Sequence, residues 1–432
     1  MDQQTSGRAG LRALVGVLAA AVLVAACSSS GKSSSSAGSS SATSTAPATS
    51  SAITDLLGPA KQATGTAVKV GVISDGRNPA ADNTIEEGVA KATFAYLDGY
   101  GGIGGRPVKV STCETHGDPG GATTCANQMI QDGVVAVIIG QSAVVSNVYT
   151  PLHDAHMPTF LYGVFDQKIL SDTGSTFALG NPFAALADLP TAVAAANNIK
   201  NVAVAVIDVP AATSFWEQEG PANFKKSGLT LDLVRIPIGA ADVTPQMQRI
   251  VSSGKKTLVH IIGADSTCIA VLNGLKAVGF TGPVTLVQQC VDDATRKAVP
   301  ASVLNGINMS ATSPVGDPND PGLQLYQQKI APQVSGQADP GSAAELMFIS
   351  VMAFHVAMQG VTGDVTPQTV VTTIKGMPSQ LLPGGGGVHF RCNGKAVAAY
   401  PALCVRGGLV TQLNDKGQPT TYKPVGDTPV EN

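Results

Sequence analysis

The sequence is poor in charged and aromatic residues and has no excess of positive charge. Of its 432 residues, 13% are charged and 4% are aromatic, and the formal net charge is -3. The lack of a basic excess argues against a nucleic-acid partner. A chain of this length that is 44% hydrophobic can bury a sizeable core, most simply in two domains. Scarce aromatics beside 48 glycines favour an α/β protein.

The apolar run near the start is too short to cross a membrane. Arg8 and Arg12 precede the run at residues 14–26, an order typical of an export signal. The sequence VAAC ends the run and is similar to a bacterial lipobox, in which the cysteine becomes the acylated N-terminus. The alternative is an ordinary signal with a chance cysteine. We predict a signal peptide over 1–26, lipidation at Cys27 and anchoring on the extracytoplasmic face of the cell membrane.

The segment after the lipobox has no pattern that could form a core. Residues 27–64 are dominated by serine, alanine, threonine and glycine. Such chain behaves as a flexible linker, and roughly 30 residues of it span on the order of 30 Å. We predict a tether that holds a globular body clear of the membrane.

The six cysteines beyond Cys27 contain no C-x-x-C pair, which argues against a zinc site. Six cysteines allow 15 connectivities. An exported protein meets an oxidising compartment, and these cysteines form three couples that are local in sequence. We therefore predict disulfides joining Cys113 to Cys125, Cys268 to Cys290, and Cys392 to Cys404.

Strand and helix patterns alternate from residue 67 onward. Apolar runs predict strands at 67–74, 107–112, 134–140 and 157–162, and later at 201–208, 229–237, 257–265, 283–289 and 305–314. Helical patterns separate them, which predicts parallel sheets covered by helices. The very apolar segment 341–360 contains Glu345 and His355, so we expect a buried helix rather than a membrane span. The tail suggests small antiparallel strands clipped by a disulfide.

Residues 99–104, GYGGIG, match the dinucleotide-binding pattern G-x-G-x-x-G. That function needs a strand before the glycines and a helix after them, because the pyrophosphate binds the helix N-terminus. Here a helical pattern comes first and a strand follows. We interpret the glycines as a helix stop and tight turn, and we expect Gly101 and Gly104 to need positive φ.

No catalytic or metal-binding constellation is present. GQSAV at 140–144 lacks the closing glycine of a nucleophile elbow. His153 and His156 have no third ligand nearby in sequence, so capping or solvated roles are favoured over metal binding. We expect no enzyme activity, no cofactor and no metal.

The order of motifs after the tether resembles a known family. The stretches VKVGVISDG, YLDGYGGIGGRPVKV and DGVVAVIIG, together with Asp118 and Pro119 at a helix start, are typical of the leucine/isoleucine/valine-binding branch of type I periplasmic solute-binding proteins of ABC importers. Cys113 and Cys125 also stand where family members carry a strand-to-helix disulfide. The resemblance continues more weakly over nearly all of the remaining chain.

The resemblance implies an α/β fold of two Rossmann-like lobes joined by a three-segment hinge. We expect crossings near 179–181, 310–313 and 360–367, an N-terminal lobe of residues 65–180 and 313–362, and a C-terminal lobe of 181–312 and 363–432. Ligand would bind between the lobes at the carboxyl ends of the strands, and hinge closure would bury it.

The strand ends then supply the candidate ligand-binding residues. They are Ser74, Asp75, Gln141, Ser142, Tyr162, Gly163 and Phe165 in the first lobe, and Asp208, Trp216, Gln288 and Asp292 in the second. Two alternatives stay open: Asp208 would cap the following helix, and Trp216 would pack inside the second lobe.

The cleft departs from the pattern of amino-acid binders in the family. Ala143, Val144 and Val164 stand where hydroxyl residues are expected, and glutamines stand where an acid is expected. Backbone amides could still bind a carboxylate. We expect a branched-chain amino acid or amide-like solute, delivered by a monomeric lipoprotein to the permease of an ABC importer. The alternative is a sensor or structural lipoprotein of the same fold without a transport role.

Overall fold

The computed structural model describes residues 57–432, apart from 79–81, 315–316, 318 and 335–342. All described residues belong to one compact unit that begins at residue 47. The expected signal peptide, the lipidation site Cys27 and most of the tether lie outside the described residues. No described helix is long and apolar enough to span a membrane.

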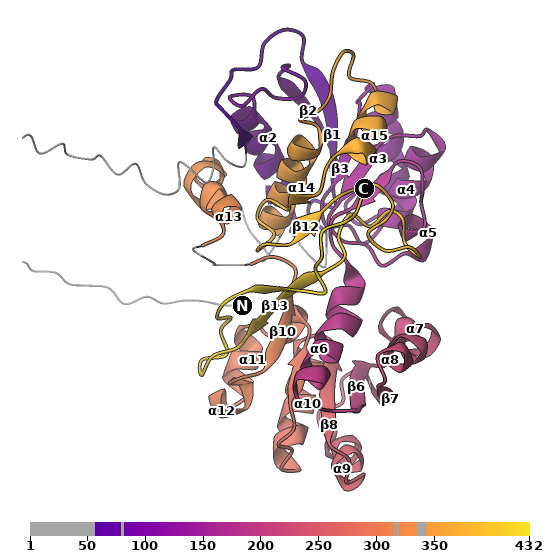
Figure 1. Ribbon diagram of the computed structural model, residues 1–432, viewed down its shortest axis with the longest axis vertical. Coiled ribbons are helices and arrows are strands. Elements are labelled where there is room, and N and C mark those ends of the chain that lie inside the picture. Colours follow the sequence, from indigo (N-terminus) through magenta and orange to yellow (C-terminus); the bar gives the residue numbers. More distant parts are fainter. Residues whose placement is uncertain (1–56, 79–81, 315–316, 318, 335–342) are drawn as a thin grey trace, which may run out of the picture. The chain divides into compact units, whose positions relative to one another are not determined.

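The first lobe is built on a five-stranded parallel sheet with the order β2-β1-β3-β4-β5 (Figure 1). Its strands are β1 (Val68–Ser74), β2 (Val108–Glu114), β3 (Val137–Ile139), β4 (Thr159–Leu161) and β5 (Thr176–Ala178). The connecting helices are α2 (Ile85–Leu97), α3 (Pro119–Gln131), α4 (Val145–Asp154) and α5 (Gln167–Leu170). Four of these strands match the sequence patterns, and β5 is an addition to them.

Both faces of this sheet are covered, as the apolar strand sequences indicate. Val70 and Val72 belong to one hydrophobic core with Ile138, while Ile73 belongs to the core on the other face. Alternate residues of a strand point to opposite faces, so an uninterrupted apolar strand fits a sheet with helices on both sides.

The most apolar segment of the described chain forms a helix inside the first lobe. In α14 (Ala343–Ala357) all 15 residues are buried, Glu345 and His355 among them. The Phe354 ring packs edge-on against Phe94 of α2 and Phe160 of β4, with ring centroids 6.5 and 5.7 Å apart. The expectation of a buried core helix is confirmed.

The second lobe is built on a seven-stranded sheet with the order β14-β13-β10-β9-β8-β6-β7. Five strands are parallel: β6 (Asn201–Ile207), β7 (Thr230–Ile236), β8 (Thr257–Ile262), β9 (Val284–Leu286) and β10 (Asn308–Ala311). Two antiparallel strands, β13 (Gly408–Gln412) and β14 (Lys423–Val425), extend the β10 edge.

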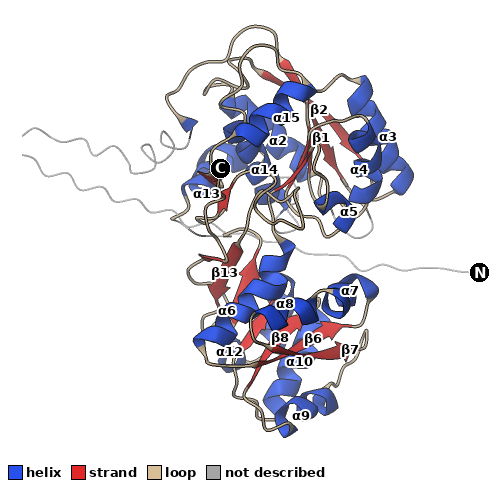
Figure 2. Cartoon of the chain, turned by 45° about the vertical axis from the view of Figure 1, so that its right-hand side comes forward, coloured by secondary structure: helices blue, strands red, loops and turns tan. Residues whose placement is uncertain are grey.

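Helices flank this second sheet (Figure 2). They are α6 (Leu189–Ala196), α7 (Pro210–Gln218), α8 (Gly220–Lys226), α9 (Thr244–Ser252), α10 (Asp265–Ala277), α11 (Asp293–Ala298) and α12 (Ala301–Leu304). A π-helical turn at Ala184–Asp188 leads into α6, and a 3-10 turn at Gln288–Cys290 follows β9. One hydrophobic core between sheet and helices contains buried residues from the range 194–309 together with Leu413.

One expected boundary is wrong. Residues 363–432 were assigned to the second lobe, but α15 (Pro367–Gly376), β11 (Gln380–Leu381) and β12 (His389–Phe390) pack on the first. Val370, Ile374 and Phe390 are fully buried in the first lobe's core, which fixes this segment there. The crossing expected near 360–367 therefore does not occur.

The chain instead crosses between Val405, in the first lobe's core, and Gly408, where β13 begins. After β14 it returns to the first lobe, where Asp427 binds both the backbone N–H and the ring Nδ1 of His389 (3.2 and 2.8 Å). Figure 1 accordingly shows the C-terminus close to β12. The other two crossings lie near the expected positions, after β5 and after β10.

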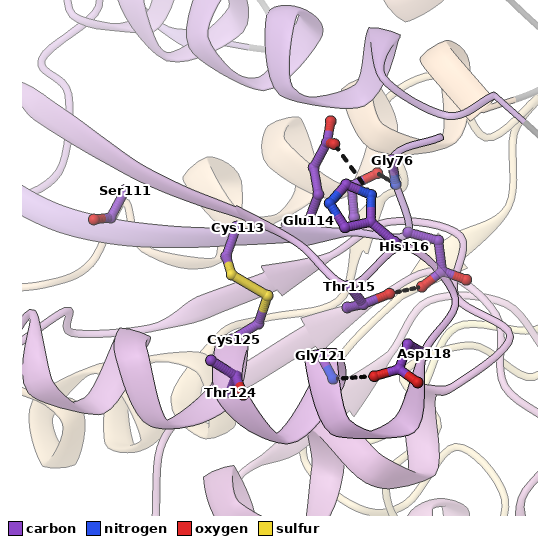
Figure 3. The surroundings of a disulfide bond; sticks show 12 residues. Gly76, Ser111, Cys113, Glu114, Thr115, His116, Asp118, Gly121, Thr124 and Cys125 are labelled. Carbon is purple, nitrogen blue, oxygen red and sulfur yellow. Dashed lines mark hydrogen bonds and ion pairs between the residues drawn. A yellow bond between two sulfur atoms is a disulfide. The ribbon is translucent and has the colours of Figure 1, made fainter. Parts of the chain in front are cut away.

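All three predicted disulfides are present. Cys113 bonds to Cys125, Cys268 to Cys290, and Cys392 to Cys404. The first ties β2 to α3, whose N-terminus is capped by Asp118 accepting from Gly121 N–H at 2.6 Å (Figure 3).

The glycine-rich stretch is a turn between α2 and β2, as expected from its position. Gly101 and Gly104 have φ of 95° and 59°, the left-handed region that glycine adopts without strain. A Cβ on Gly102 would lie 2.1 Å from the Arg106 carbonyl oxygen, so the turn also needs glycine for space.

Candidate ligand-binding site

A cavity of about 730 Å³ lies where the carboxyl ends of both sheets meet the crossing segments. This volume lies within the range of about 300–1,000 Å³ typical of small-molecule pockets. The lining comes from the ends of β4, β6, β8, β9 and β10, from residues 179–186 after β5, from α7, and from the 382–409 region. The lining includes Tyr162, Gly163, Phe165, Gln167, Phe183, Ile207, Phe215, Gln218, Glu219, Ile262, Val287, Gln288, Gln289, Ser310 and Thr312.

Aromatic rings form one wall of this cavity. The Phe183 ring lies 5.5 Å from Phe215 and stacks on Tyr400 at 4.6 Å, measured between centroids. Phe165 is 74% exposed, which is unusual for so large an apolar side chain. Exposed apolar area that lines a cavity marks a place where a ligand can be buried.

Neutral amide and hydroxyl groups provide most of the polar lining. Gln288 Oε1 accepts from the backbone N–H and the hydroxyl of Thr312, at 2.8 and 3.0 Å. These two bonds orient the amide, so its NH₂ group remains to donate to another acceptor. The Tyr162 hydroxyl donates to the Thr312 carbonyl oxygen, and burial raises the pKa of this tyrosine.

Glu219 joins the two lobes across the cavity rim. It lies between α7 and α8, and its two carboxylate oxygens accept from Gln167 Nε2 at 2.6 Å and from the Tyr400 hydroxyl at 2.7 Å. Gln167 belongs to α5 of the first lobe. Burial, then the hydrogen bond to Glu219, raises the pKa of Tyr400 to about 12, so this tyrosine remains a donor at neutral pH.

Four of the eleven candidate residues line the cavity: Tyr162, Gly163, Phe165 and Gln288. They follow the ends of β4 and β9. The other seven lie elsewhere, and their surroundings explain why.

Ser74 and Asp75 are buried inside the first lobe. The Ser74 hydroxyl contacts Glu86 Oε2 at 2.5 Å, and Asp75 accepts from the Thr115 hydroxyl at 2.6 Å and from Ala143 N–H at 2.7 Å. Glu86 Oε1 accepts from Gln141 N–H at 2.7 Å. Both acids therefore bind backbone amides of the loop after β3, the segment that also contains Ser142.

Burial raises the pKa of Glu86 to about 8, against the opposing hydrogen bonds from Ser74 and Gln141. The hydrogen bonds around Glu86 are compatible with a protonated carboxyl group. Its O–H can donate to Ser74 Oγ, which also accepts from Gly76 N–H at 3.0 Å and donates to the Asn83 carbonyl at 3.3 Å. The Ser74 hydroxyl then uses its one donor and both of its acceptor lone pairs.

In the second lobe, three candidates have structural contacts away from the cavity. Asp208 is exposed and forms an ion pair with Arg235 at 3.2 Å. Asp292 caps α11 by accepting from Thr295 N–H at 2.8 Å, which lowers its pKa. Trp216 is 1% exposed and packs among Phe224 and His260 in the core, so the alternative of core packing fits its position.

Sequence reasoning missed several cavity residues. Phe183 and Phe215 are candidates that no motif marks: Phe183 follows β5, which the sequence patterns did not predict, and Phe215 lies seven residues after the predicted strand 201–208. Glu219 and Glu86 were assigned only to helical patterns, because nothing local distinguishes them from solvated helix residues. No described group of three or more His, Cys, Asp or Glu residues could hold a metal ion.

Two lobes built on mainly parallel sheets, several crossings and a cavity at the strand ends are the architecture of a two-lobed binding protein. The family comparison agrees: residues 67–409 match the model of the periplasmic binding protein family, and the chain belongs to that family. Its members bind solutes, so the chain is a binding protein and not an enzyme. A search of curated protein sequences finds no match.

Solved structures show the same fold. A putative branched-chain amino acid ABC transporter protein from Rhodospirillum rubrum aligns with a TM-score of 0.65 at 16% identity, covering 85% of this chain and 100% of that one. A substrate-binding protein from Sphaerobacter thermophilus gives 0.63 at 18% identity, covering 84% and 99%. LivJ from Streptococcus pneumoniae, solved with isoleucine, gives 0.58 at 13% identity, covering 83% and 99%.

Proposed function

We propose that this protein is the lipid-anchored extracytoplasmic binding component of an ABC importer. It captures a small organic solute in the cavity between its lobes and presents the closed form to a permease. Branched-chain amino acids and amide-like compounds are the candidate solute classes.

The cavity carries this proposal. Residues from both sheets and from the crossing segments line it, so one ligand there would contact both lobes at once. A ligand that contacts both lobes stabilises their closed arrangement by its differential affinity for that state. Glu219, which already joins the lobes through Gln167 and Tyr400, would close with them.

The sequence supports anchoring, and the family comparison supports transport. The VAAC motif at 24–27 and the serine-rich chain after it favour a lipid anchor on the outer face of the membrane. The family and its branched-chain amino acid relatives favour delivery to a permease.

Thermal-shift screening of residues 47–432 against amino acids, amides and small aromatic compounds tests solute binding. A stabilising compound should also compact the protein in small-angle scattering, because closure brings the lobes together. Stabilisation without compaction would argue for a cleft that binds but does not close. A screen in which no compound stabilises the protein would count against the proposal.

A further inference from the structure

We propose that the cavity selects an uncharged or cationic ligand with a large apolar part and excludes ligands that must bury a carboxylate. The inference rests on the proposed function and chooses between its two candidate solute classes: it favours amide-like compounds over branched-chain amino acids, whose carboxylate the cavity would have to bury. Three independent features of the cavity support it.

The cavity offers no cation to a ligand carboxylate. Within the part of the chain that the structure describes, no lysine, arginine or histidine lines it, and Glu219 is its only charged side chain. Burying an ionised carboxylate without a partner is strongly unfavourable, and a second carboxylate nearby adds repulsion. A ligand ammonium, by contrast, could approach Glu219.

Two backbone amides at the carboxyl end of the first lobe's sheet, which could have bound a ligand carboxylate, are already used. Strand β3 pairs in parallel with β4, so the loop after β3 lies at the same carboxyl end of the sheet as Tyr162. In that loop, Gln141 N–H donates to Glu86 and Ala143 N–H donates to Asp75, both at 2.7 Å. The protein's own acids thus occupy two donors that a ligand carboxylate could otherwise use.

The remaining lining suits neutral polar groups on an apolar body. Phe165, Phe183 and Phe215 provide apolar area, and the free NH₂ of Gln288 can donate to a ligand carbonyl. Gln218 and Gln289 add further amide groups to the lining. Amide side chains pair with amides, ketones and hydroxyls without any change of charge.

Isothermal titration calorimetry with probes of one size tests this selectivity. The protein is the unit of residues 47–432, which contains both sheets, their cores and all three disulfides. The probes are 3-phenylpropanamide, 3-phenylpropylamine and 3-phenylpropanoate, with isoleucine as the zwitterion. We expect the amide and the amine to bind, and the carboxylate and isoleucine to bind about tenfold more weakly or not at all.

A variant pair locates the binding. Phe215→Ala removes a ring from the cavity wall and should weaken amide binding about fivefold. Phe280→Ala is the control, since Phe280 is a half-buried ring of the same lobe that does not line the cavity. It should leave the affinity within about twofold.

Equal or tighter binding of 3-phenylpropanoate or isoleucine would overturn the charge preference while leaving solute binding intact. Failure of all four probes would also overturn it, and the thermal-shift screen then decides separately whether the protein binds some other solute. Loss of amide binding to the same extent in Phe280→Ala would show that the probe binds outside the cavity.

Discussion

The two lobes use the carboxyl ends of their parallel strands differently. In the first lobe, the ends of β1 and β3 are closed by a buried network in which Asp75 and Glu86 bind the loop that follows β3, and Ser74 contacts Glu86. In the second lobe, the ends of β6, β8, β9 and β10 open into the cavity through Ile207, Ile262, Val287 and Ser310. Residues at the ends of β1 and β3 therefore serve folding. Residues at the ends of the second lobe's strands face the cavity, as Tyr162 does after β4 of the first lobe.

The difference shows that a strand end alone does not define a binding residue. Backbone N–H groups after a parallel strand must find acceptors, and either a ligand or the protein can supply them. Where a nearby helix carries an acid such as Glu86 into reach, the protein supplies the acceptor itself.

Gly140→Ala should have the largest effect on stability, because it disrupts the buried hydrogen-bond network of the first lobe. A Cβ at this position would lie 2.3 Å from Glu86 Oε2, so the carboxyl group must move and Gln141 N–H loses its acceptor. We expect a loss of about 3 kcal/mol in unfolding free energy, measured by calorimetry. Gly163→Ala is the control after the neighbouring strand, where a Cβ would have no atom within 4 Å. Equal losses in the two variants would contradict the network.

The pH dependence of stability should reveal Glu86. Its pKa of about 8 in the folded state exceeds the ordinary value of 4.5, so folding binds a proton between these values. Its stabilising contribution is complete below pH 4.5 and is lost as the pH rises through 8.

Glu86→Gln mimics the protonated acid and should remove this dependence. From pH 5.5 to 7.5 the wild-type protein should lose about 2 kcal/mol relative to Glu86→Gln, measured by unfolding at each pH. A constant difference between the two proteins across this range would show that Glu86 does not titrate there.

Tyr162→Phe tests a contact between the first lobe and the crossing after β10. It removes the hydrogen bond to the Thr312 carbonyl and should cost about 1 kcal/mol. Tyr96→Phe also removes one hydroxyl contact, a 3.1 Å pair with Tyr100 that lies away from the cavity. Hydrogen exchange around residue 312 should increase only in Tyr162→Phe. Unchanged exchange there would contradict a role in holding the crossing.

Glu219→Gln should have the smallest effect on stability, below about 1 kcal/mol, because the contacts at the rim are partly exposed. One of the two donors, Gln167 or Tyr400, loses its acceptor, so the unliganded lobes should separate more in small-angle scattering. The control is Glu217→Gln, whose partner Arg235 lies in the same lobe. An equal change in scattering for both variants would contradict a bridging role for Glu219.

Local patterns predicted most of the elements and the covalent links. The strand runs, the buried helix α14 and the turn at Gly101 and Gly104 follow from periodicity and from the order of helix and strand. The three disulfides followed from neighbouring cysteines in an exported chain. Each of these depends on residues close in sequence, where the period of a strand or helix fixes which side chains can meet.

Tertiary packing alone decided which strand-end residues reach the cavity. Ser74 ends β1 and Trp216 lies in the helix after β6, whereas Tyr162 and Gln288 follow β4 and β9. The first two are buried, and the second two line the cavity. The sequence by itself determined the lobes' strands, their covalent ties and the family resemblance. The path of residues 367–408, the buried acids Asp75 and Glu86, and the aromatic wall depend on contacts between segments distant in sequence. No local pattern encodes these contacts.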